Sequence, residues 1–292
     1  MKKIVSLERR TLTCVGRSVQ LLHKAPDFTA VSEELEELNL ASFGKRIKVI
    51  NFFLSLDTPV CDIQVREFNK FSSALSEDIV VIGISRDLPF AQKRFKETFH
   101  IRNMQLISDY KYGSFGINYG VLIKELNLLA RGVVILDSVN TIRHLQLQSE
   151  LSNQPDYEET RRQLEEVKKN PAVQPAVLPA ELPIEDFPKP SAHGGRTTYL
   201  LPRETVDRLL ASHSEWELLK GKSLVKQLRF KSYPDAKYSL DLLSCIAEEQ
   251  NHHPSFLLDY NRLKVTLTTH EAGGLTEKDF IMAGIIDDVT GD

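Results

Sequence analysis

Apolar runs alternate with helix-prone segments in the first half of the chain. The runs at 48–53, 79–84 and 132–136 have the length and composition of buried strands. Between the first two runs lies a segment with apolar residues at helical spacing, namely Phe68, Phe71 and Leu75. Strands that alternate with helices favour a mixed α/β sheet that is covered on both faces.

The last hundred residues show a different order of elements. Helices are predicted at 203–211 and 234–250, and strands at 223–230 and 263–268. The motif Thr276-x-x-Asp279 is a variant capping box that begins a final helix, and we assign Asp279 this structural role alone. The pattern predicts an α+β domain with helices on one face of a small antiparallel sheet.

A proline-rich segment separates the two patterns. Six of the 13 prolines lie between Pro171 and Pro190, directly after a charged, helix-prone stretch at 157–169. Closely spaced prolines cannot continue a helix and favour extended backbone. We therefore predict a semi-rigid linker at 170–194, with domains at 1–169 and 195–292.

The composition narrows the class of protein. The chain has 292 residues, of which 41% are hydrophobic and 26% charged, as in soluble globular proteins. A net charge of −3 gives no reason to expect a nucleic-acid or membrane partner. The few, odd-numbered cysteines (Cys14, Cys61 and Cys245) suit a reducing compartment, and no apolar run follows Lys2-Lys3. We expect a cytoplasmic protein.

Cys61 lies in a context that suits a reactive thiol. Thr58 is a good helix N-cap and Pro59 is favoured at the first helical position, so Cys61 falls in the first turn. Unpaired N–H groups and the helix dipole stabilise a thiolate there, and a thiolate attacks peroxide oxygen. Arg131, just before the third predicted strand, offers a cation. A buried, inert cysteine is the alternative.

The N-terminal residues resemble the thiol peroxidases, an atypical two-cysteine branch of the peroxiredoxins. The resemblance is carried by Leu56-Asp57-Thr58-Pro59-Val60-Cys61 and by the segments 85–95, 129–134 and 155–157. It implies a thioredoxin-like fold and a peroxidatic Cys61 that Thr58 and Arg131 activate. It also implies hydrogen peroxide or alkyl hydroperoxides as substrates, a thioredoxin-like thiol reductant and no bound cofactor.

Two residues depart from that family pattern. Leu54 stands where the family usually has a proline that shields the thiolate, and Lys96 stands where the resolving cysteine is expected. The usual intradomain disulfide therefore cannot form. Cys61 would be resolved by an external thiol, by Cys14 or by Cys245; otherwise the domain is an inactive scaffold.

Three histidines stand close to predicted element ends in the second domain. His252 and His253 follow a helix that Pro254 stops, and His270 follows a strand. Imidazoles titrate near neutral pH, so such a group suits proton transfer on a substrate. Binding of zinc is the alternative, but adjacent histidines rarely ligate one metal, and we predict no metal site.

Residues 247–254 and 269–276, within the region 197–288, resemble the pterin-4a-carbinolamine dehydratases. The resemblance implies dehydration of 4a-hydroxytetrahydrobiopterin to quinonoid dihydropterin, as in tetrahydrobiopterin recycling. It implies His253 and His270 as acid and base, with His252 orienting the pterin or assisting as a base. Substrate contacts are expected from Trp216, Glu248 and Pro254.

Together these features predict a fusion of a peroxidase with a dehydratase. The expected ligands are a peroxide and a pterin, the expected partner is an aromatic amino-acid hydroxylase, and we expect a homo-oligomer. The alternative is non-enzymatic: an N-terminal scaffold joined to a C-terminal dimerisation or interaction module.

Overall fold

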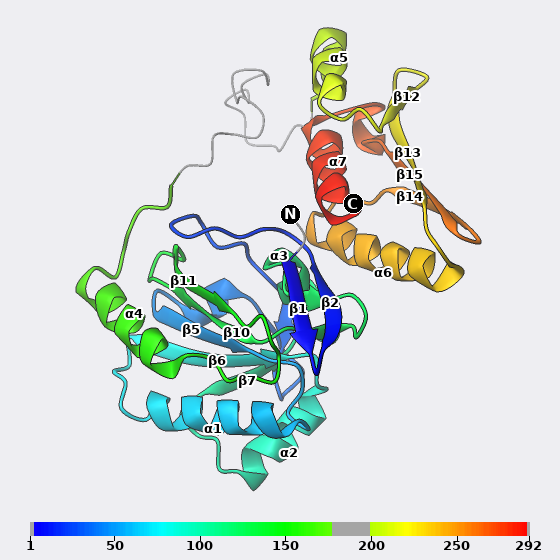
Figure 1. Cartoon of the computed structure of the whole chain (residues 1–292). Coiled ribbons are helices and arrows are strands. Elements are labelled where there is room, and N and C mark those ends of the chain that lie inside the picture. Colours follow the sequence, from blue (N-terminus) through cyan, green and yellow to red (C-terminus); the bar gives the residue numbers. More distant parts are fainter. Residues whose placement is uncertain (1–2, 177–198, 291–292) are drawn as a thin grey trace. The chain divides into compact units, whose positions relative to one another are not determined.

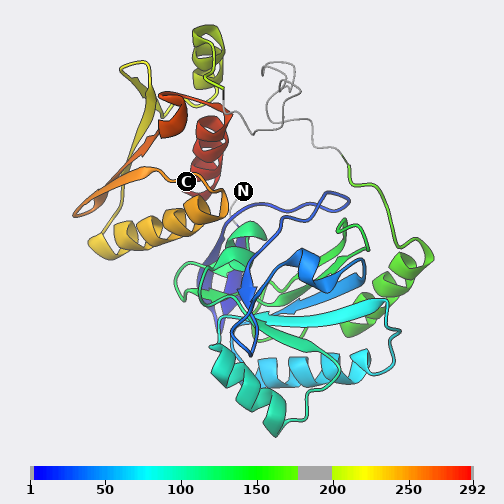
Figure 2. The same cartoon turned by 180° about the vertical axis from the view of Figure 1, so that it is seen from behind.

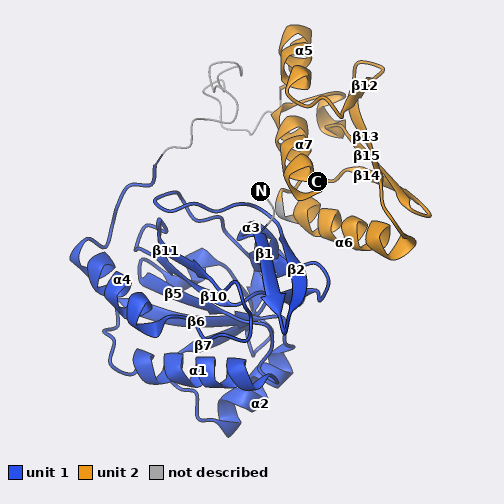
Figure 3. Ribbon diagram, viewed as in Figure 1, with its two compact units in different colours: residues 1–177 blue, residues 178–292 orange. Residues whose placement is uncertain are grey.

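The chain folds into two compact units. The computed structural model describes residues 3–176 and 199–290, and the units comprise Met1–Val177 and Leu178–Asp292 (Figure 3). The predicted linker at 170–194 falls mostly outside the described residues.

The first residues of the predicted linker are bound to unit 1. The hydroxyl of Ser138 donates to the carbonyl oxygen of Pro171 at 2.6 Å. The backbone N–H of Val173 donates to Asp137 Oδ2 at 2.9 Å, and that of Ala176 to the Leu22 oxygen at 2.7 Å. These bonds tie the described end of the proline-rich segment to the surface of unit 1.

Unit 1 is built on a mixed sheet, as predicted, and this sheet has seven strands. The strand order is β11-β10-β5-β6-β7-β3-β4, and only the β5–β6 and β6–β7 pairs are parallel. All residues of the three central strands β5, β6 and β10 are buried, which explains their continuous apolar runs. The strands are β3 (Ala30–Val31), β4 (Glu37–Leu38), β5 (Ile47–Phe52), β6 (Ile79–Ser85), β7 (Gln105–Ser108), β10 (Gly132–Leu136) and β11 (Ile142–Leu147).

The helices of unit 1 pack against this sheet. Helices α1 (Pro59–Ser72) and α2 (Pro89–Thr98) contact β6 and β7, and they lie on the same side of the sheet (Figures 1 and 2). Helix α4 (Tyr157–Lys169) contacts β11, and α3 (Ser114–Asn118) and a 3-10 turn, η1 (Leu40–Phe43), complete the set. Of the three residues predicted on one helix face, Phe68 is buried and Phe71 is half-buried on α1, whereas Leu75 lies beyond the end of the helix.

A second, smaller sheet in unit 1 was not predicted. Its antiparallel order is β1-β2-β8-β9, with β1 (Lys3–Leu7), β2 (Arg10–Val15), β8 (Leu122–Ile123) and β9 (Leu128–Leu129). Two of these strands have only two residues, and the other two are half-exposed. Neither a long apolar run nor a clear alternation therefore marks them in the sequence.

Unit 2 has the predicted antiparallel sheet with helices on one face. The order is β12-β13-β15-β14, and β15 buries Leu263, Val265 and Leu267 alternately. Helices α6 and α7 both contact β15 on the same face (Figures 1 and 2). The elements are α5 (Arg203–Ala211), β12 (Glu217–Leu219), β13 (Ser223–Arg229), α6 (Tyr233–Glu249), β14 (Ser255–Asp259), β15 (Arg262–Leu267), the 3-10 turn η3 (His270–Ala272) and α7 (Glu277–Thr290).

No helix in the described parts of either unit is both long and apolar enough to cross a membrane.

Candidate active sites of the two units

Cys61 lies in the first turn of α1 and is completely buried. Thr58 has the extended backbone of an N-cap, and its carbonyl oxygen accepts the Cys61 N–H at 3.1 Å. The Thr58 side chain makes no capping bond to the helix. Its hydroxyl instead donates to the Ser55 carbonyl oxygen at 3.0 Å, so the first-turn N–H groups keep no side-chain partner from Thr58.

The guanidinium of Arg131 contacts the sulfur of Cys61. Arg131 is 2% exposed, and its Nη2 donates to Cys61 Sγ at 3.2 Å. Nε donates to the Leu151 carbonyl oxygen at 2.8 Å, and Nη1 donates to Gln64 Oε1. Among the described residues no carboxylate forms an ion pair with Arg131. The Cys61 sulfur therefore lies against a buried cation that has no carboxylate partner among the described residues.

Gln64 is a site residue that the sequence analysis did not single out. Its side chain is completely buried, and its Nε2 donates to Asn51 Oδ1 on β5 while its Oε1 accepts from Arg131. Gln64 thus fixes the guanidinium relative to the sheet. The available signal was a glutamine three residues after Cys61, on the face of α1 that also buries Val65 and Phe68.

The other two cysteines lie in different settings. Cys14 on β2 is 4% exposed, and burial raises the pKa of its thiol to about 11. Cys245 lies on α6 of unit 2 and is half-buried. Lys96, at the position where the resolving cysteine was expected, forms an ion pair with Glu33, and Leu54 is buried.

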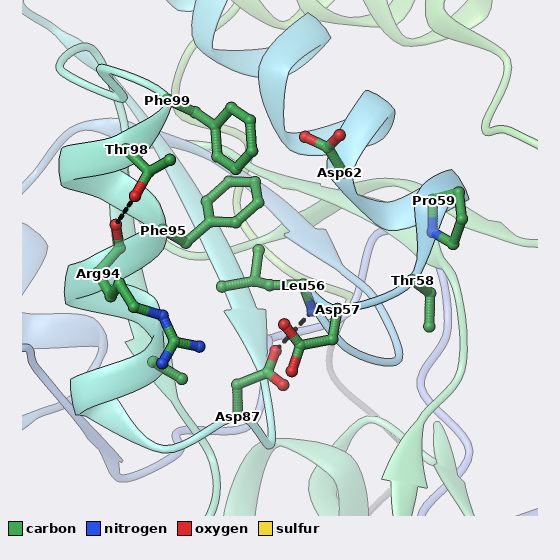
Figure 4. Close-up of a pocket in the computed structure, with 11 residues that line it drawn as sticks. Leu56, Asp57, Thr58, Pro59, Asp62, Asp87, Arg94, Phe95, Thr98 and Phe99 are labelled. Carbon is green, nitrogen blue, oxygen red and sulfur yellow. Dashed lines mark hydrogen bonds between the residues drawn. The ribbon is translucent and has the colours of Figure 1, made fainter.

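A cavity of about 410 Å³ lies between the start of α1 and helix α2 (Figure 4). Thr58 and Pro59 line it, so it adjoins the turn that carries Cys61. Its other walls are apolar and charged side chains, among them Leu56, Asp57, Asp87, Arg94 and Phe99.

His252 in unit 2 belongs to a buried hydrogen-bond network. Its Nε2 lies 2.8 Å from Oδ1 of Asp279, which is completely buried. Oδ2 of Asp279 accepts from the Thr269 hydroxyl and from the Thr276 N–H, both at 2.8 Å. Asp279 therefore does more than cap α7, the only role assigned from the sequence. It joins the loop after α6, the end of β15 and the start of α7.

The other two histidines are exposed. His253 Nε2 lies 2.9 Å from Glu248 Oε2, and both side chains are open to solvent. His270 begins η3, and among the described residues its side chain makes no hydrogen bond. Half-buried Pro254 separates His253 from β14. The structure thus pairs His252 with Asp279 and His253 with Glu248. It places His270 beside Thr269 of the same network.

The described residues contain no group of three or more His, Cys, Asp or Glu side chains that could hold a metal ion.

Trp216 belongs to a second network in unit 2. The ring is 3% exposed, and its Nε1 donates to Asp287 Oδ1 at 2.8 Å. Lys226 Nζ donates to the same oxygen at 2.7 Å, and His213 Nδ1 lies 2.9 Å from Oδ2. Burial opposes the charge of Asp287, but the bonds from His213, Lys226 and Trp216 outweigh it and lower the pKa of Asp287.

The two networks of unit 2 lie at opposite ends of α7. Asp279 is in the first turn and Asp287 is eight residues later, which corresponds to about 12 Å along a helix. Trp216 is therefore anchored at the other end of the helix from His252. Its predicted contact with a pterin stays a prediction.

Comparison with known proteins agrees with the division into two units. Residues 22–161 match the redoxin family model, and residues 199–289 match the pterin 4 alpha carbinolamine dehydratase model. A thiol peroxidase of Staphylococcus saprophyticus is 41% identical over 154 residues, which are 53% of this chain and 93% of that protein. A thiol peroxidase of Bacillus subtilis is 42% identical over 147 residues, 50% of this chain and 87% of that protein.

A solved structure supports the fold of unit 1. The peroxiredoxin-like protein of Aquifex aeolicus is 35% identical, with a TM-score of 0.54, over 56% of this chain and 97% of that one. This similarity confirms the thioredoxin-like fold predicted for the N-terminal region. The chain therefore belongs to the thiol peroxidase family through its N-terminal region, and its C-terminal region is a pterin-4a-carbinolamine dehydratase domain.

Proposed function

We propose that unit 1 reduces hydroperoxides through Cys61. The observation that carries this proposal is the 3.2 Å contact between Arg131 Nη2 and Cys61 Sγ in a buried setting. The Cys61 thiolate attacks one peroxide oxygen and the O–O bond breaks. The products are a Cys61 sulfenic acid and a hydroxide (from hydrogen peroxide) or alkoxide (from an alkyl hydroperoxide) that takes up a proton. A fixed guanidinium stabilises the charge that develops on the peroxide oxygens.

The sulfenic acid of Cys61 is then resolved by a thiol from outside unit 1. Cys14 is a poor nucleophile because its thiol is buried and its pKa is raised to about 11. Lys96 occupies the position of the usual resolving cysteine and is ion-paired with Glu33. Of the thiols outside unit 1, which also include Cys245 of unit 2, we propose a thiol reductant for this step, either a small molecule or a thioredoxin-like protein.

The test of the peroxidase is direct trapping of the intermediate. One equivalent of hydrogen peroxide is added to the reduced protein with a sulfenic-acid trap, and peptide masses are followed over time. We expect rapid trapping at Cys61 and none at that peptide in a Cys61→Ser variant. An unreacted Cys61 would support the alternative in which unit 1 is an inactive scaffold.

We propose that unit 2 dehydrates 4a-hydroxytetrahydrobiopterin to quinonoid dihydropterin. The supporting observation is the fixed His252, which the buried Asp279 holds at 2.8 Å, next to the exposed His253–Glu248 pair. The reaction needs a proton delivered to the leaving 4a-hydroxyl and a proton removed from N5. The exposed His253 and His270 are free to contact a substrate and exchange protons, while His252 orients it.

The test of the dehydratase is the rate at which the carbinolamine disappears. Replacement of both His253 and His270 by alanine should lower the rate of dehydration to that of the spontaneous reaction without enzyme. A His100→Asn variant, which changes an exposed histidine of unit 1, serves as the matched control and should retain full activity. Full retention in the double variant would favour the alternative, in which unit 2 is a dimerisation or interaction module.

A further inference from the structure

Two opposite charges without partners face the cavity that Thr58 and Pro59 line at the start of α1. Within the described residues, neither the Asp57 carboxylate nor the Arg94 guanidinium has a hydrogen-bond or ion-pair partner from a side chain or the backbone. Figure 4 shows both groups directed toward the space between α1 and α2. Both residues are exposed, so a ligand from solvent can reach them.

The remaining polar groups of this cavity are already occupied. Asp87 accepts from the hydroxyls of Ser55 at 2.6 Å and Ser85 at 2.7 Å, and from the Leu56 N–H at 2.8 Å. Asp62 forms an ion pair with Arg66 at 2.7 Å. A ligand therefore finds one free carboxylate and one free guanidinium in this cavity.

The rest of the wall is apolar and limits the size of a ligand. Leu56, Phe95 and Phe99 line the cavity, and its volume of about 410 Å³ lies near the low end of small-ligand sites, which hold roughly 300–1,000 Å³. A ligand that is complementary to this cavity carries an ammonium group for Asp57, a carboxylate for Arg94 and a short apolar stem for the apolar wall. That combination is the chemistry of an amino acid or a very short peptide.

We propose that this cavity binds a small aminothiol that also carries a carboxylate, and that this thiol resolves the Cys61 sulfenic acid. Arg94 binds its carboxylate and Asp57 binds its ammonium group. The inference rests on the proposed peroxidase function, and it names the class of reductant that the sequence left open.

The cavity adjoins the helix turn that carries Cys61. Thr58 and Pro59 line it and also begin the helix that carries Cys61. The sulfur is enclosed, so the first turn of α1 must open for a second sulfur to reach it. Because the Thr58 side chain bonds to Ser55 and not to the helix N–H groups, this opening breaks no side-chain cap from Thr58.

Reduction of the Cys61 sulfenic acid back to the thiol consumes two molecules of the small thiol. The first attacks the sulfenic sulfur, a Cys61–S–S–R disulfide forms, and the hydroxyl leaves with a proton as water. The second thiol attacks that disulfide, which releases the symmetric disulfide R–S–S–R and returns Cys61 to the thiol. The peroxide is the oxidant and the two thiols together supply the two electrons.

The first experiment compares thiols that differ in one charged group. The Cys61 sulfenic acid is formed with one equivalent of hydrogen peroxide, and its decay is timed with L-cysteine, cysteamine (no carboxylate) and 3-mercaptopropionate (no amine). Each thiol is compared across variants of the full chain, so that its intrinsic reactivity cancels.

Each variant should lose rate only with the thiols that carry its partner group. Arg94→Gln should slow L-cysteine and 3-mercaptopropionate roughly three- to tenfold and leave cysteamine unchanged. Asp57→Asn should slow L-cysteine and cysteamine and leave 3-mercaptopropionate unchanged. Arg94→Lys should recover part of the rate. Lys93→Gln and Glu97→Gln alter exposed charges on α2 that do not line the cavity, and they should change nothing.

A binding experiment separates the site from the redox step. S-methyl-L-cysteine has no free thiol and cannot react with the sulfenic acid, so it reports binding alone. When it is added to the full chain, the amide chemical shifts of Leu56, Ala91 and Phe99 should change in the native protein and remain unchanged in Arg94→Gln. Absence of any sulfenic acid would refute the peroxidase itself and, with it, the redox role of the cavity.

Other results would refute the cavity alone. If sulfenic acid forms but all variants react alike with every thiol, or S-methyl-L-cysteine causes no shifts, the inference is wrong while the peroxidase stands. Much faster resolution by a thioredoxin-type dithiol protein, unaffected by Arg94→Gln and Asp57→Asn, would likewise overturn it in favour of a protein reductant.

Discussion

The guanidinium of Arg131 lies 3.2 Å from the sulfur of Cys61, although 70 residues separate them in the chain. Both side chains are buried, and Gln64 and Leu151 hold the remaining nitrogens of the guanidinium. The contact therefore depends on a fixed arginine and not on a mobile surface charge.

Replacement of Arg131 should slow sulfenic-acid formation at Cys61. We expect Arg131→Gln to lower the rate by about 10²-fold, because a preorganised donor and its charge are both lost. Arg131→Lys keeps the charge but not the planar set of donors, and should lose roughly tenfold. The measurement is stopped-flow reaction of the reduced protein with hydrogen peroxide.

The control for this prediction is Arg143→Gln, which changes an arginine paired with Asp137 elsewhere in unit 1. Its rate with peroxide should equal that of the native protein. Circular dichroism of each variant verifies that unit 1 is folded. A folded Arg131→Gln protein with the native rate would contradict a role for this contact.

The hydroxyl of Thr58 should matter more for peroxide chemistry than for stability. It donates to the Ser55 oxygen and makes no helix cap, so its loss should cost less than the ~1 kcal/mol typical of a capping side chain. We expect Thr58→Val to react with peroxide on the order of tenfold more slowly. Thr58→Ser keeps the hydroxyl and should stay within about threefold of the native rate. Equal rates in the two variants would exclude the hydroxyl from the reaction.

Asp279 should support both the stability and the activity of unit 2. It is buried and accepts hydrogen bonds from Thr269 and Thr276 besides its contact with His252. Asp279→Ala leaves these groups without their acceptor and should destabilise unit 2 by about 3 kcal/mol. Urea unfolding followed by fluorescence of Trp216, the single tryptophan, reports this unit.

A milder variant tests the link to His252. Asp279→Asn keeps the shape of the side chain but changes its charge, and we expect dehydration to slow by roughly tenfold while the unit stays folded. Asp288→Asn, an exposed aspartate on the same helix, is the matched control for both variants. Native activity in Asp279→Asn would show that the pair serves the fold only.

The Asp287 network predicts a stability that depends on acid pH. The pKa of Asp287 is lowered in the folded protein, so its stabilisation is complete above the unfolded pKa of about 3.9 and is lost as the pH falls through the lower folded value. Asp287→Asn should therefore lower the unfolding free energy by about 1–3 kcal/mol at pH 7.

The difference between the native protein and Asp287→Asn should shrink below about pH 4. Urea titrations at a series of pH values, with Trp216 fluorescence as the signal, measure it. Asp288→Asn should show no such pH-dependent difference. A constant difference down to the lowest pH at which unit 2 folds would contradict the assignment.

The elements that could be predicted are those whose burial produces a continuous or periodic pattern of apolar residues in the sequence. Strands β5, β6 and β10 are buried on both faces, so their sequences are apolar throughout and their bounds were found within a residue or so. The short strands of the β1-β2-β8-β9 sheet were missed, because two-residue strands pair through backbone groups that leave no side-chain pattern.

The proline-rich segment also shows that a local sequence pattern does not reveal long-range contacts. Its composition predicts extended backbone, but composition does not say what that backbone binds. In the structure, Pro171 and Val173 are held by hydrogen bonds with Asp137, Ser138 and Thr141 of unit 1. A local pattern therefore described the conformation of the segment and not its contacts.

The sequence by itself predicted two domains, and it determined the place of the cysteine in the first turn of α1 and of the histidines that follow α6 and β15. Each of these depends on neighbours within a few residues, through capping, periodicity or a proline stop. Only the tertiary structure decided that Arg131 reaches Cys61, that Gln64 fixes Arg131, and that Asp279 holds His252. These contacts join segments 27 to 70 residues apart. Their geometry depends on how the sheet and helices pack, and this packing cannot be predicted from a local pattern of residues.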